Sequence, residues 1–485
     1  MTCAPCVGAA STTTTTRLSP YCAPTPVPPP DARDSRPTLI SITGSARTSP
    51  ARSPRLTAAE LPFLAPAIPV PGTAYRSGGA TADDPGRLPL SELETVMPNH
   101  PPGVSRETRQ GGDLTSAARR ISLDLSVCSN RLGPPDSAVR ALESFAAERY
   151  RELGPPPYGA EKAYLAAYAA HLDVDESQLL CGRGVTEFLM IFGRLLQSED
   201  VALVTPEYTE TMRQFSHAAF YPPAIGRQDC IEHRNERLLQ AMRNHRYVVL
   251  SNPNNPQGLY TNTATLLEAC HQNPNCTLVV DEEYIEFQGP ALSLAGADAD
   301  NLVVLQSTGK TWGVTATRAG ILWTRDTTLH HAVQHQLPAW PLSLLDITVA
   351  TAALVDNEWA HRILPRVRHD AQALEELLRD RFGEAVIPSN IHFRFVHLED
   401  PDAVAEHLED YGIAVRVFDG AVRGRISGMR VMTPDTAKEF DLLKDALATI
   451  PRRLRRGTTS NFRYPGKSVL ETIPAATTPF QAQTT

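Results

Sequence analysis

The chain has 485 residues, of which 42% are hydrophobic and 21% are charged, so it can bury a large core and form one to three soluble domains. Its formal net charge of −8 and the lack of a sustained basic stretch argue against a nucleic-acid-binding protein. No apolar run approaches the roughly 20 residues that a membrane-spanning helix needs, so we expect no membrane partner.

The two ends of the chain differ in composition from its middle. Residues 1–105 contain 19 of the 41 prolines and a run of threonines at 12–16, and such a segment cannot bury enough apolar surface to fold. We predict a disordered extension there and a disordered tail at residues 456–485. Eight scattered cysteines suit a reducing, cytoplasmic location. The Ser/Thr/Arg-rich start leaves organellar import as the alternative.

Between these ends, the first clear pattern is a glycine turn at 182–184 before an apolar helical run that extends to residue 196. A helix N-terminus after such a turn offers free N–H groups and a positive dipole end to an anion. Three apolar, β-branched runs follow at 246–253, 277–284 and 302–308, with a helix predicted around 263–272. Apolar strands with helical crossovers predict a parallel or mixed sheet covered on both faces, which we assign to a large domain at 150–340.

The pattern changes after residue 340. It is helical through 350–382 and then returns to short strands at 391–396 and 413–417, which an amphipathic stretch separates. This order is typical of a smaller α+β domain, which we assign to residues 341–455.

Polar residues follow the three apolar strands at the points where they end. Asn255 follows the first strand, Asp281 and Tyr284 end the second, and Lys310 follows the third. In open α/β sheets, ligands bind beyond the carboxyl ends of the strands, so these side chains would share one crevice. They suit a pyridine cofactor held as a Schiff base on Lys310, with the carboxylate keeping the ring nitrogen protonated.

The motifs "SNPNNPQG" (251–258), "DEEY" (281–284) and "STGKTWGVTATRAG" (307–320) resemble the class I/II aminotransferases, which are fold-type I enzymes dependent on pyridoxal phosphate (PLP). The closest resemblance is to the histidinol-phosphate aminotransferase and threonine-phosphate decarboxylase subgroup. It implies an α/β, aminotransferase-like fold with a large, mixed but mostly parallel sheet domain and a smaller α+β domain. Residues 106–149 would then form an N-terminal arm that packs on the small domain.

The resemblance also implies residue roles. Lys310 would be the Schiff-base lysine, Asp281 the partner of the pyridinium nitrogen, and Tyr284 a contact of the ring oxygen. The further residues implied to bind PLP are Gly184, Val185, Thr186, Tyr208, Asn255, Ser307 and Arg318. Tyr158 would reach the cofactor phosphate of a neighbouring subunit, which implies a homodimer. Arg430 would bind the substrate carboxylate, a bidentate role suited to a planar guanidinium, and Asn130 would be a second substrate contact. No metal is implied.

The sequence also departs from this family. Gly309 stands where a serine or threonine usually precedes the lysine, Val185-Thr186 replaces the common Ser-Asp, and Arg131 breaks an Asn-Pro pair. Four arginines could bind a distal anion of the substrate, although solvated charge is the default for them; they are Arg183, Arg416, Arg423 and Arg425.

We predict a PLP-dependent aminotransferase that acts on an amino acid through Schiff-base chemistry, with a phosphorylated substrate left open. The stretch "QGGD" at 110–113 favours the first alternative, a PLP-dependent decarboxylase of a phosphorylated or phosphonate amino acid. The second alternative is a non-catalytic PLP-fold binding or regulatory protein.

Overall fold

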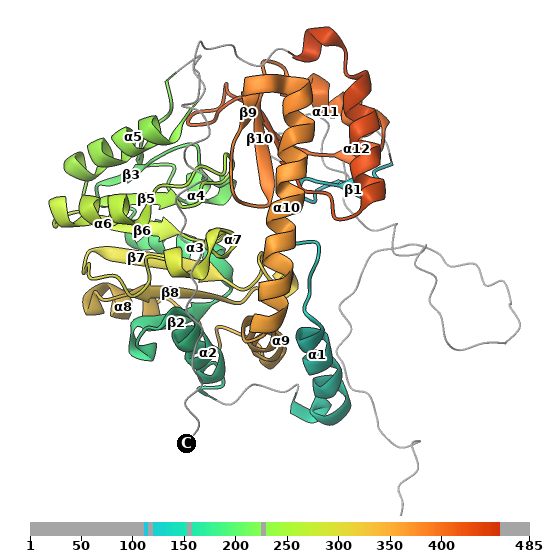
Figure 1. Ribbon diagram of the computed structural model, residues 1–485. Helices are drawn as coiled ribbons and strands as arrows, with labels where there is room; N and C mark the ends of the chain where they lie inside the picture. The colour runs from blue at the N-terminus through green and yellow to red at the C-terminus, as the bar shows by residue number, and fades with distance from the viewer. Residues whose placement is uncertain (1–110, 115–119, 153–157, 225–228, 456–485) are drawn as a thin grey trace, which may run out of the picture. The chain divides into compact units, whose positions relative to one another are not determined.

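The largest element of the fold is a seven-stranded sheet with the strand order β2-β8-β7-β6-β5-β3-β4 (Figure 1). The computed structural model describes residues 111–114, 120–152, 158–224 and 229–455, so the predictions for 1–105 and 456–485 lie outside the described residues. The strands are β2 (Leu179–Gly182), β3 (Val201–Leu203), β4 (Ala219–Phe220), β5 (Tyr247–Ser251), β6 (Thr277–Asp281), β7 (Leu302–Ser307) and β8 (Gly320–Thr324). Strands β4, β3, β5, β6 and β7 pair in parallel, and β8 is antiparallel to both β7 and β2.

Successive side chains of the central strands enter two different cores, because neighbouring residues of a strand point to opposite faces. In β5, Val248 and Leu250 pack in one core, whereas Val249 packs in the other, and β6 and β7 repeat this alternation. Both faces of the sheet are therefore buried, which explains why its strands are continuously apolar.

Helices on both sides of the sheet supply the remainder of the two cores. The first core takes side chains from α2, α5, α6 and α9, and the second takes them from α3, α4 and α8. These helices and the short α7 are α2 (Lys162–Leu172), α3 (Gly184–Leu195), α4 (Thr209–Gln214), α5 (Ile231–Asn244), α6 (Thr263–Gln272), α7 (Ile285–Gln288), α8 (Thr327–Gln334) and α9 (Leu344–Leu354). The 3₁₀ turns are η3 (Tyr150–Glu152), η4 (Glu176–Gln178), η5 (Pro290–Leu292), η6 (Thr315–Thr317), η7 (Gly383–Ala385) and η8 (Arg452–Arg455).

A second, antiparallel sheet has the order β12-β13-β10-β9 and a core of its own. Its strands are β9 (Val386–Ile387), β10 (Phe393–His397), β12 (Arg416–Phe418) and β13 (Gly428–Met432), and its helices are α10 (Asn357–Phe382), α11 (Pro401–Asp410) and α12 (Ala437–Thr449). In the described part of the chain, no helix combines the length and the apolar character needed to cross a membrane.

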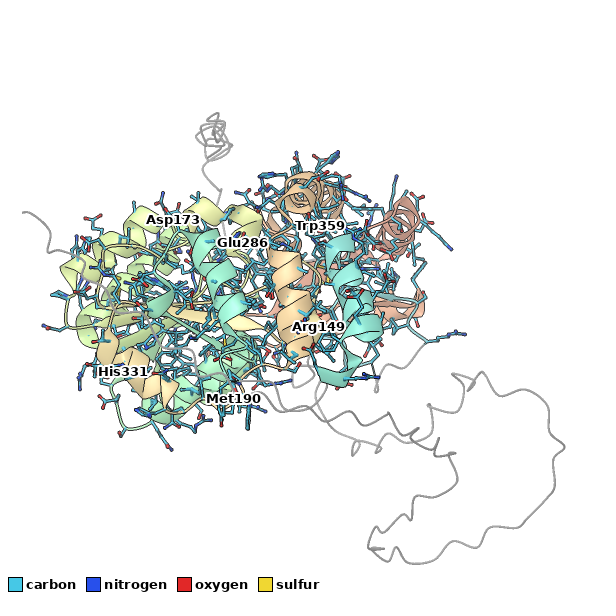
Figure 2. The ribbon with its side chains drawn as sticks, turned by 90° about the horizontal axis from the view of Figure 1, so that it is seen from below. Arg149, Asp173, Met190, Glu286, His331 and Trp359 are labelled. Carbon is cyan, nitrogen blue, oxygen red and sulfur yellow. The ribbon has the colours of Figure 1, made fainter. Side chains whose placement is uncertain are left out.

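The N-terminal arm touches both halves of the fold. Its short strand β1 (Leu123–Asp124) pairs in parallel with β11 (Ile413–Ala414), and its helix α1 (Asp136–Glu148) packs against α9. The long helix α10 joins the two cores. Trp359, which is labelled in Figure 2, lies in its first turn and packs in the large core, whereas Leu364 packs in the small one. The boundary that we predicted after residue 340 thus precedes the change of core, which falls within α10.

The predicted fold class is confirmed, and the three central strands and α6 lie where the sequence placed them. Two predicted elements are each divided in the structure. The helical stretch 350–382 is interrupted before Asn357, because the Asp356 side chain accepts a hydrogen bond from the Trp359 amide and caps a new helix. The strand predicted at 413–417 is two short strands, β11 and β12, which belong to different sheets.

Candidate active site

One pocket lies at the carboxyl ends of β5, β6 and β7 and brings most of the predicted residues together. Those that line it are Gly184, Val185, Thr186, Tyr208, Asn255, Asp281, Tyr284, Ser307, Lys310, Arg318 and Arg430. Pairing of Ser251 with Asp281, and of Asp281 with Leu305, ends the three strands at the same edge of the sheet. The parallel pairing therefore assembles these side chains from segments far apart in the sequence.

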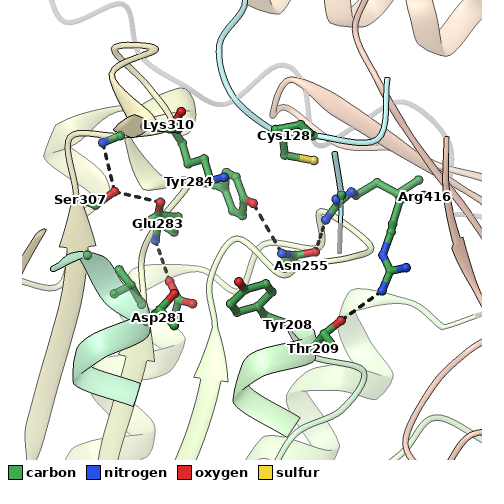
Figure 3. Close-up of a pocket in the computed structure, with 18 of the residues that line it drawn as sticks. Cys128, Tyr208, Thr209, Asn255, Asp281, Glu283, Tyr284, Ser307, Lys310 and Arg416 are labelled. Carbon is green, nitrogen blue, oxygen red and sulfur yellow. Dashed lines mark hydrogen bonds between the residues drawn. The ribbon is translucent and has the colours of Figure 1, made fainter. Parts of the chain in front are cut away.

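Asp281 is buried at the end of β6, with 6% of its surface exposed. The Glu283 amide donates a hydrogen bond to its Oδ1 at 3.0 Å (Figure 3). Burial and the nearby Glu283 carboxylate raise the pKa of Asp281 well above its ordinary value. A cationic ring nitrogen would relieve this cost, so the pocket fits a protonated pyridine at this point.

Tyr284, Asn255 and Arg430 form a hydrogen-bonded chain across the pocket. The Asn255 Nδ2 donates to the Tyr284 hydroxyl at 3.5 Å (Figure 3), and the Arg430 Nη1 donates to Asn255 Oδ1 at 2.5 Å. Burial raises the pKa of Tyr284, so its phenol stays protonated and can donate to a ring oxygen. The Arg430 Nη2 donates to the Ser126 carbonyl at 3.0 Å, and its Nε has no hydrogen-bond partner among the described residues.

A buried ion pair outside the pocket lining fixes the loop that carries Asn255. Arg234 donates to Glu207 at 2.7 Å, and both side chains are almost fully buried. Glu207 in turn accepts from the Ser251 amide at 2.9 Å and the Ser251 hydroxyl at 2.5 Å. The same hydroxyl oxygen accepts a hydrogen bond from the backbone N–H of Asn255 at 3.0 Å, so the ion pair positions Asn255 through Ser251.

The other end of the pocket has the features of an anion site. Helix α3 begins at Gly184, whose φ of +73° is a left-handed conformation that glycine adopts readily. A Cβ on Gly184 would lie 3.4 Å from Arg318 Nη2, so the guanidinium packs closely on the first turn of the helix. Free N–H groups at this helix end and the Arg318 charge together fit a phosphate.

Gly309 stands where a serine or threonine usually precedes the lysine, and its surroundings are close. A Cβ at this position would lie 3.3 Å from Ser307 Oγ, which is closer than most Cβ contacts, and 3.4 Å from Thr315 Cα. Thr315 itself lines the pocket. A serine at 309 would therefore need the Ser307 hydroxyl to shift by a few tenths of an ångström.

Two predicted residues do not line the pocket. The Asn130 amide group donates to the Thr311 carbonyl at 2.8 Å, and its backbone N–H donates to the Lys310 carbonyl at 2.8 Å. Asn130 thus holds the Lys310 loop, and its predicted contact with a substrate stays a prediction. Tyr158 is 77% exposed and stacks on Trp340 at 5.0 Å, and its predicted role in a neighbouring subunit stays a prediction.

Two charged residues of the pocket were not among the predicted site residues. Glu283 lines it between Asp281 and Ser307, although only Asp281 and Tyr284 of "DEEY" were predicted to bind the cofactor (Figure 3). Arg416 also lines it, is buried, and donates to the Thr209 hydroxyl at 3.3 Å. The default of a solvated charge is thus wrong for Arg416, and the signal available for it was its place in an apolar strand.

A mixed sheet that presents a lysine, a carboxylate, a phenol and an amide at its strand ends defines a PLP-dependent enzyme of fold-type I. The family of class I and II aminotransferases matches residues 120–440, which is more than half of the chain. The chain therefore belongs to this family, and PLP is the family's cofactor.

Named relatives agree with this assignment. The histidinol-phosphate aminotransferase of Gluconacetobacter diazotrophicus is 28% identical over 343 residues, which cover 68% of this chain and 92% of that protein. Histidinol-phosphate aminotransferase from Sinorhizobium meliloti, solved in complex with pyridoxal-5'-phosphate, superposes with a TM-score of 0.60 at 21% identity and covers 74% of this chain and 100% of its own. L-threonine-O-3-phosphate decarboxylase from Porphyromonas gingivalis superposes with a TM-score of 0.55 at 20% identity, covering 67% and 98%. At these identities the two structures show a shared fold.

Proposed function

We propose that this protein is a PLP-dependent aminotransferase whose amino-acid substrate carries a second anionic group. The observation that supports the proposal is the convergence of Lys310, Asp281, Tyr284 and Arg430 on one pocket at the carboxyl ends of the strands. When bound, PLP supplies an aldehyde that condenses with amines and a ring that takes up electrons from the substrate Cα.

The roles of the protein's own residues follow from where they lie. Lys310 would provide the amine that holds the aldehyde carbon and would move the proton of the substrate Cα. The buried Asp281 carboxylate would pair with a proton on the ring nitrogen, while the Tyr284 phenol and the side-chain amide of Asn255 would hydrogen-bond the ring oxygen. The buried walls would limit the access of water to the reacting atoms.

Two arginines support a substrate with two anionic groups. Arg430 lies beside Asn255 and offers a planar guanidinium to a carboxylate. Arg416 enters the same pocket from β12, where it also lies 5.1 Å from the centre of the Phe418 ring. A phosphorylated or dicarboxylic amino acid would pair with both cations, whereas an apolar amino-acid side chain would lie against the charged Arg416 guanidinium.

A homodimer is the second part of the proposal. Tyr158 and Trp340 form an exposed aromatic pair, and large aromatic side chains are enriched at protein interfaces. The resemblance of Tyr158 to a residue that reaches a neighbouring subunit supports a second copy as the partner. Light scattering of the purified full chain would give the mass of a monomer if this part is wrong.

Transamination and decarboxylation would differ in their products. The test is a screen of purified, PLP-loaded protein against amino acids and amino-acid phosphates, following keto acid and carbon dioxide together. We expect keto acid that depends on an added amino acceptor. Carbon dioxide without keto acid would instead identify a decarboxylase, and turnover of no amino acid would contradict an enzymatic role.

A further inference from the structure

Glu283 places an additional carboxylate inside the pocket. Its Oε1 accepts a hydrogen bond from the Ser307 hydroxyl at 2.8 Å (Figure 3). Its Oε2 is buried and has no hydrogen-bond partner among the described residues. A buried carboxylate oxygen without a donor is costly, so this side chain is only half satisfied where it lies.

The contact with Glu283 uses the one proton of the Ser307 hydroxyl. The Ser307 oxygen accepts from the Gly309 amide at 3.1 Å, which leaves its O–H to donate to the carboxylate. A serine hydroxyl has a single donor, so it cannot donate to Glu283 and to a bound anion at the same time.

Glu283 also shares the positive charges of the anion site. Lys310 and Arg318 both lower the pKa of Glu283, although burial outweighs them and raises it. The titratable and charged groups that face Glu283 come from four segments of the chain; they are Asp281, Tyr284, Lys310, Arg318, Tyr164, Tyr168 and Tyr208. Lys310 and Arg318 are the cations among these seven, and they are also those that a cofactor phosphate and aldehyde would use.

We infer that Glu283 competes with the cofactor phosphate for Ser307 and for the surrounding positive charge. The inference rests on the proposed function, because Ser307 and Arg318 are phosphate ligands only if the pocket binds PLP. In the cofactor-free protein the carboxylate occupies the Ser307 hydroxyl, and a bound phosphate has to displace it. The pocket therefore binds a phosphorylated ring less tightly than it would with a neutral residue at 283.

The competition predicts a dependence on both phosphate and pH. Pyridoxal lacks the phosphate, so its affinity should depend much less on the charge at 283 than the affinity of PLP does. As the pH falls through the pKa of Glu283, the side chain takes up a proton and no longer repels a phosphate. The other groups that face it are chemically the same in the wild type and in Glu283→Gln, so the difference between these two proteins reports Glu283 together with its effect on the pKa of Asp281.

The experiment titrates the cofactor-free full-length chain with PLP, pyridoxal and inorganic phosphate, following absorbance or protein fluorescence. The proteins are the wild type, Glu283→Gln, Glu283→Ala and the control Glu268→Gln, which removes the same charge from an exposed position of α6. We expect Glu283→Gln to bind PLP about tenfold more tightly, or about 1.4 kcal/mol, with pyridoxal changed less than about twofold. The gain should shrink as the pH falls, and Glu268→Gln should match the wild type.

Two results would overturn the inference in distinguishable ways. If Glu283→Gln binds PLP no better than the wild type, or gains equally for pyridoxal, then the competition is wrong and the proposed function stands. If no protein binds PLP, then the proposed function fails and the inference fails with it. Glu283→Ala removes the side chain as well as the charge. Thermal unfolding of each variant would show whether a change in PLP binding is caused by a loss of stability in that variant.

Discussion

Replacing Arg234 with alanine tests how the buried ion pair between Arg234 and Glu207 stabilises the fold and the pocket. Arg234 lies on α5 with 1% of its side chain exposed, and it donates to Glu207 at 2.7 Å, to the Val204 carbonyl at 3.0 Å and to the Ser251 carbonyl at 3.2 Å. Alanine at this position would leave Glu207 charged and without a cationic partner in the core.

The size of the effect follows from this burial. Removing one member of a buried ion pair costs about 3–5 kcal/mol of the free energy of unfolding, because the remaining charge stays in the interior. Burial raises the pKa of Glu207 and Arg234 opposes that rise, so the pKa rises further in the variant. A group with a raised pKa in the folded state destabilises it as the pH rises through that value. The loss should therefore be larger at about pH 8 than at about pH 5.

Urea unfolding at the two pH values measures the free energy, and titration with PLP measures the pocket. We expect PLP to bind more weakly as well, because Glu207 positions Asn255 through Ser251. The matched control is Arg246→Ala, which breaks an exposed ion pair with Glu199 and should change stability by less than about 1 kcal/mol. A loss below about 1 kcal/mol in Arg234→Ala, or one that does not depend on pH, would refute the reasoning.

Three substitutions in the pocket test the proposed roles one at a time. Lys310→Ala removes the amine, so we expect loss of the visible absorbance of the bound cofactor and a fall in kcat of about 10²–10⁴-fold; unchanged absorbance and rate would contradict the assignment. Asp281→Asn removes the buried carboxylate that would pair with the protonated ring nitrogen, so kcat should fall at least about tenfold while the fold survives, as circular dichroism would show. Arg430→Lys keeps the charge but loses the planar pair of donors, so KM for the amino acid should rise about tenfold, with a smaller change in kcat; the reverse pattern would place Arg430 in the chemical step.

The residues at the strand ends were predictable because their signal is local. Asn255, Asp281 and Lys310 each come at or directly after a continuously apolar run, and parallel strands end at a common edge. The division of residues 413–418 into β11 and β12 was not predictable in this way. It depends on β1 and β13, which pair with the two halves from distant parts of the chain.

The sequence also did not predict in which direction the side chains beyond the strand ends point. Arg416 is buried, and it donates to the hydroxyl of Thr209, which lies more than two hundred residues earlier in the chain. Asn130 was predicted to contact the substrate. In the structure its side-chain amide donates to the Thr311 carbonyl and its backbone N–H donates to the Lys310 carbonyl. Both outcomes depend on contacts between segments that no local pattern connects.

Gly309 and Glu283 act on the same hydroxyl group, that of Ser307. Gly309 removes a side-chain donor, and its own amide donates to the Ser307 oxygen at 3.1 Å. That bond leaves the Ser307 proton for Glu283, which accepts it at 2.8 Å. A serine at 309 would place its Cβ 3.3 Å from Ser307 Oγ, so restoring the usual residue would press on the same hydroxyl. The affinity of this protein for a phosphate would therefore depend on whether the Ser307 hydroxyl donates to the phosphate or to Glu283.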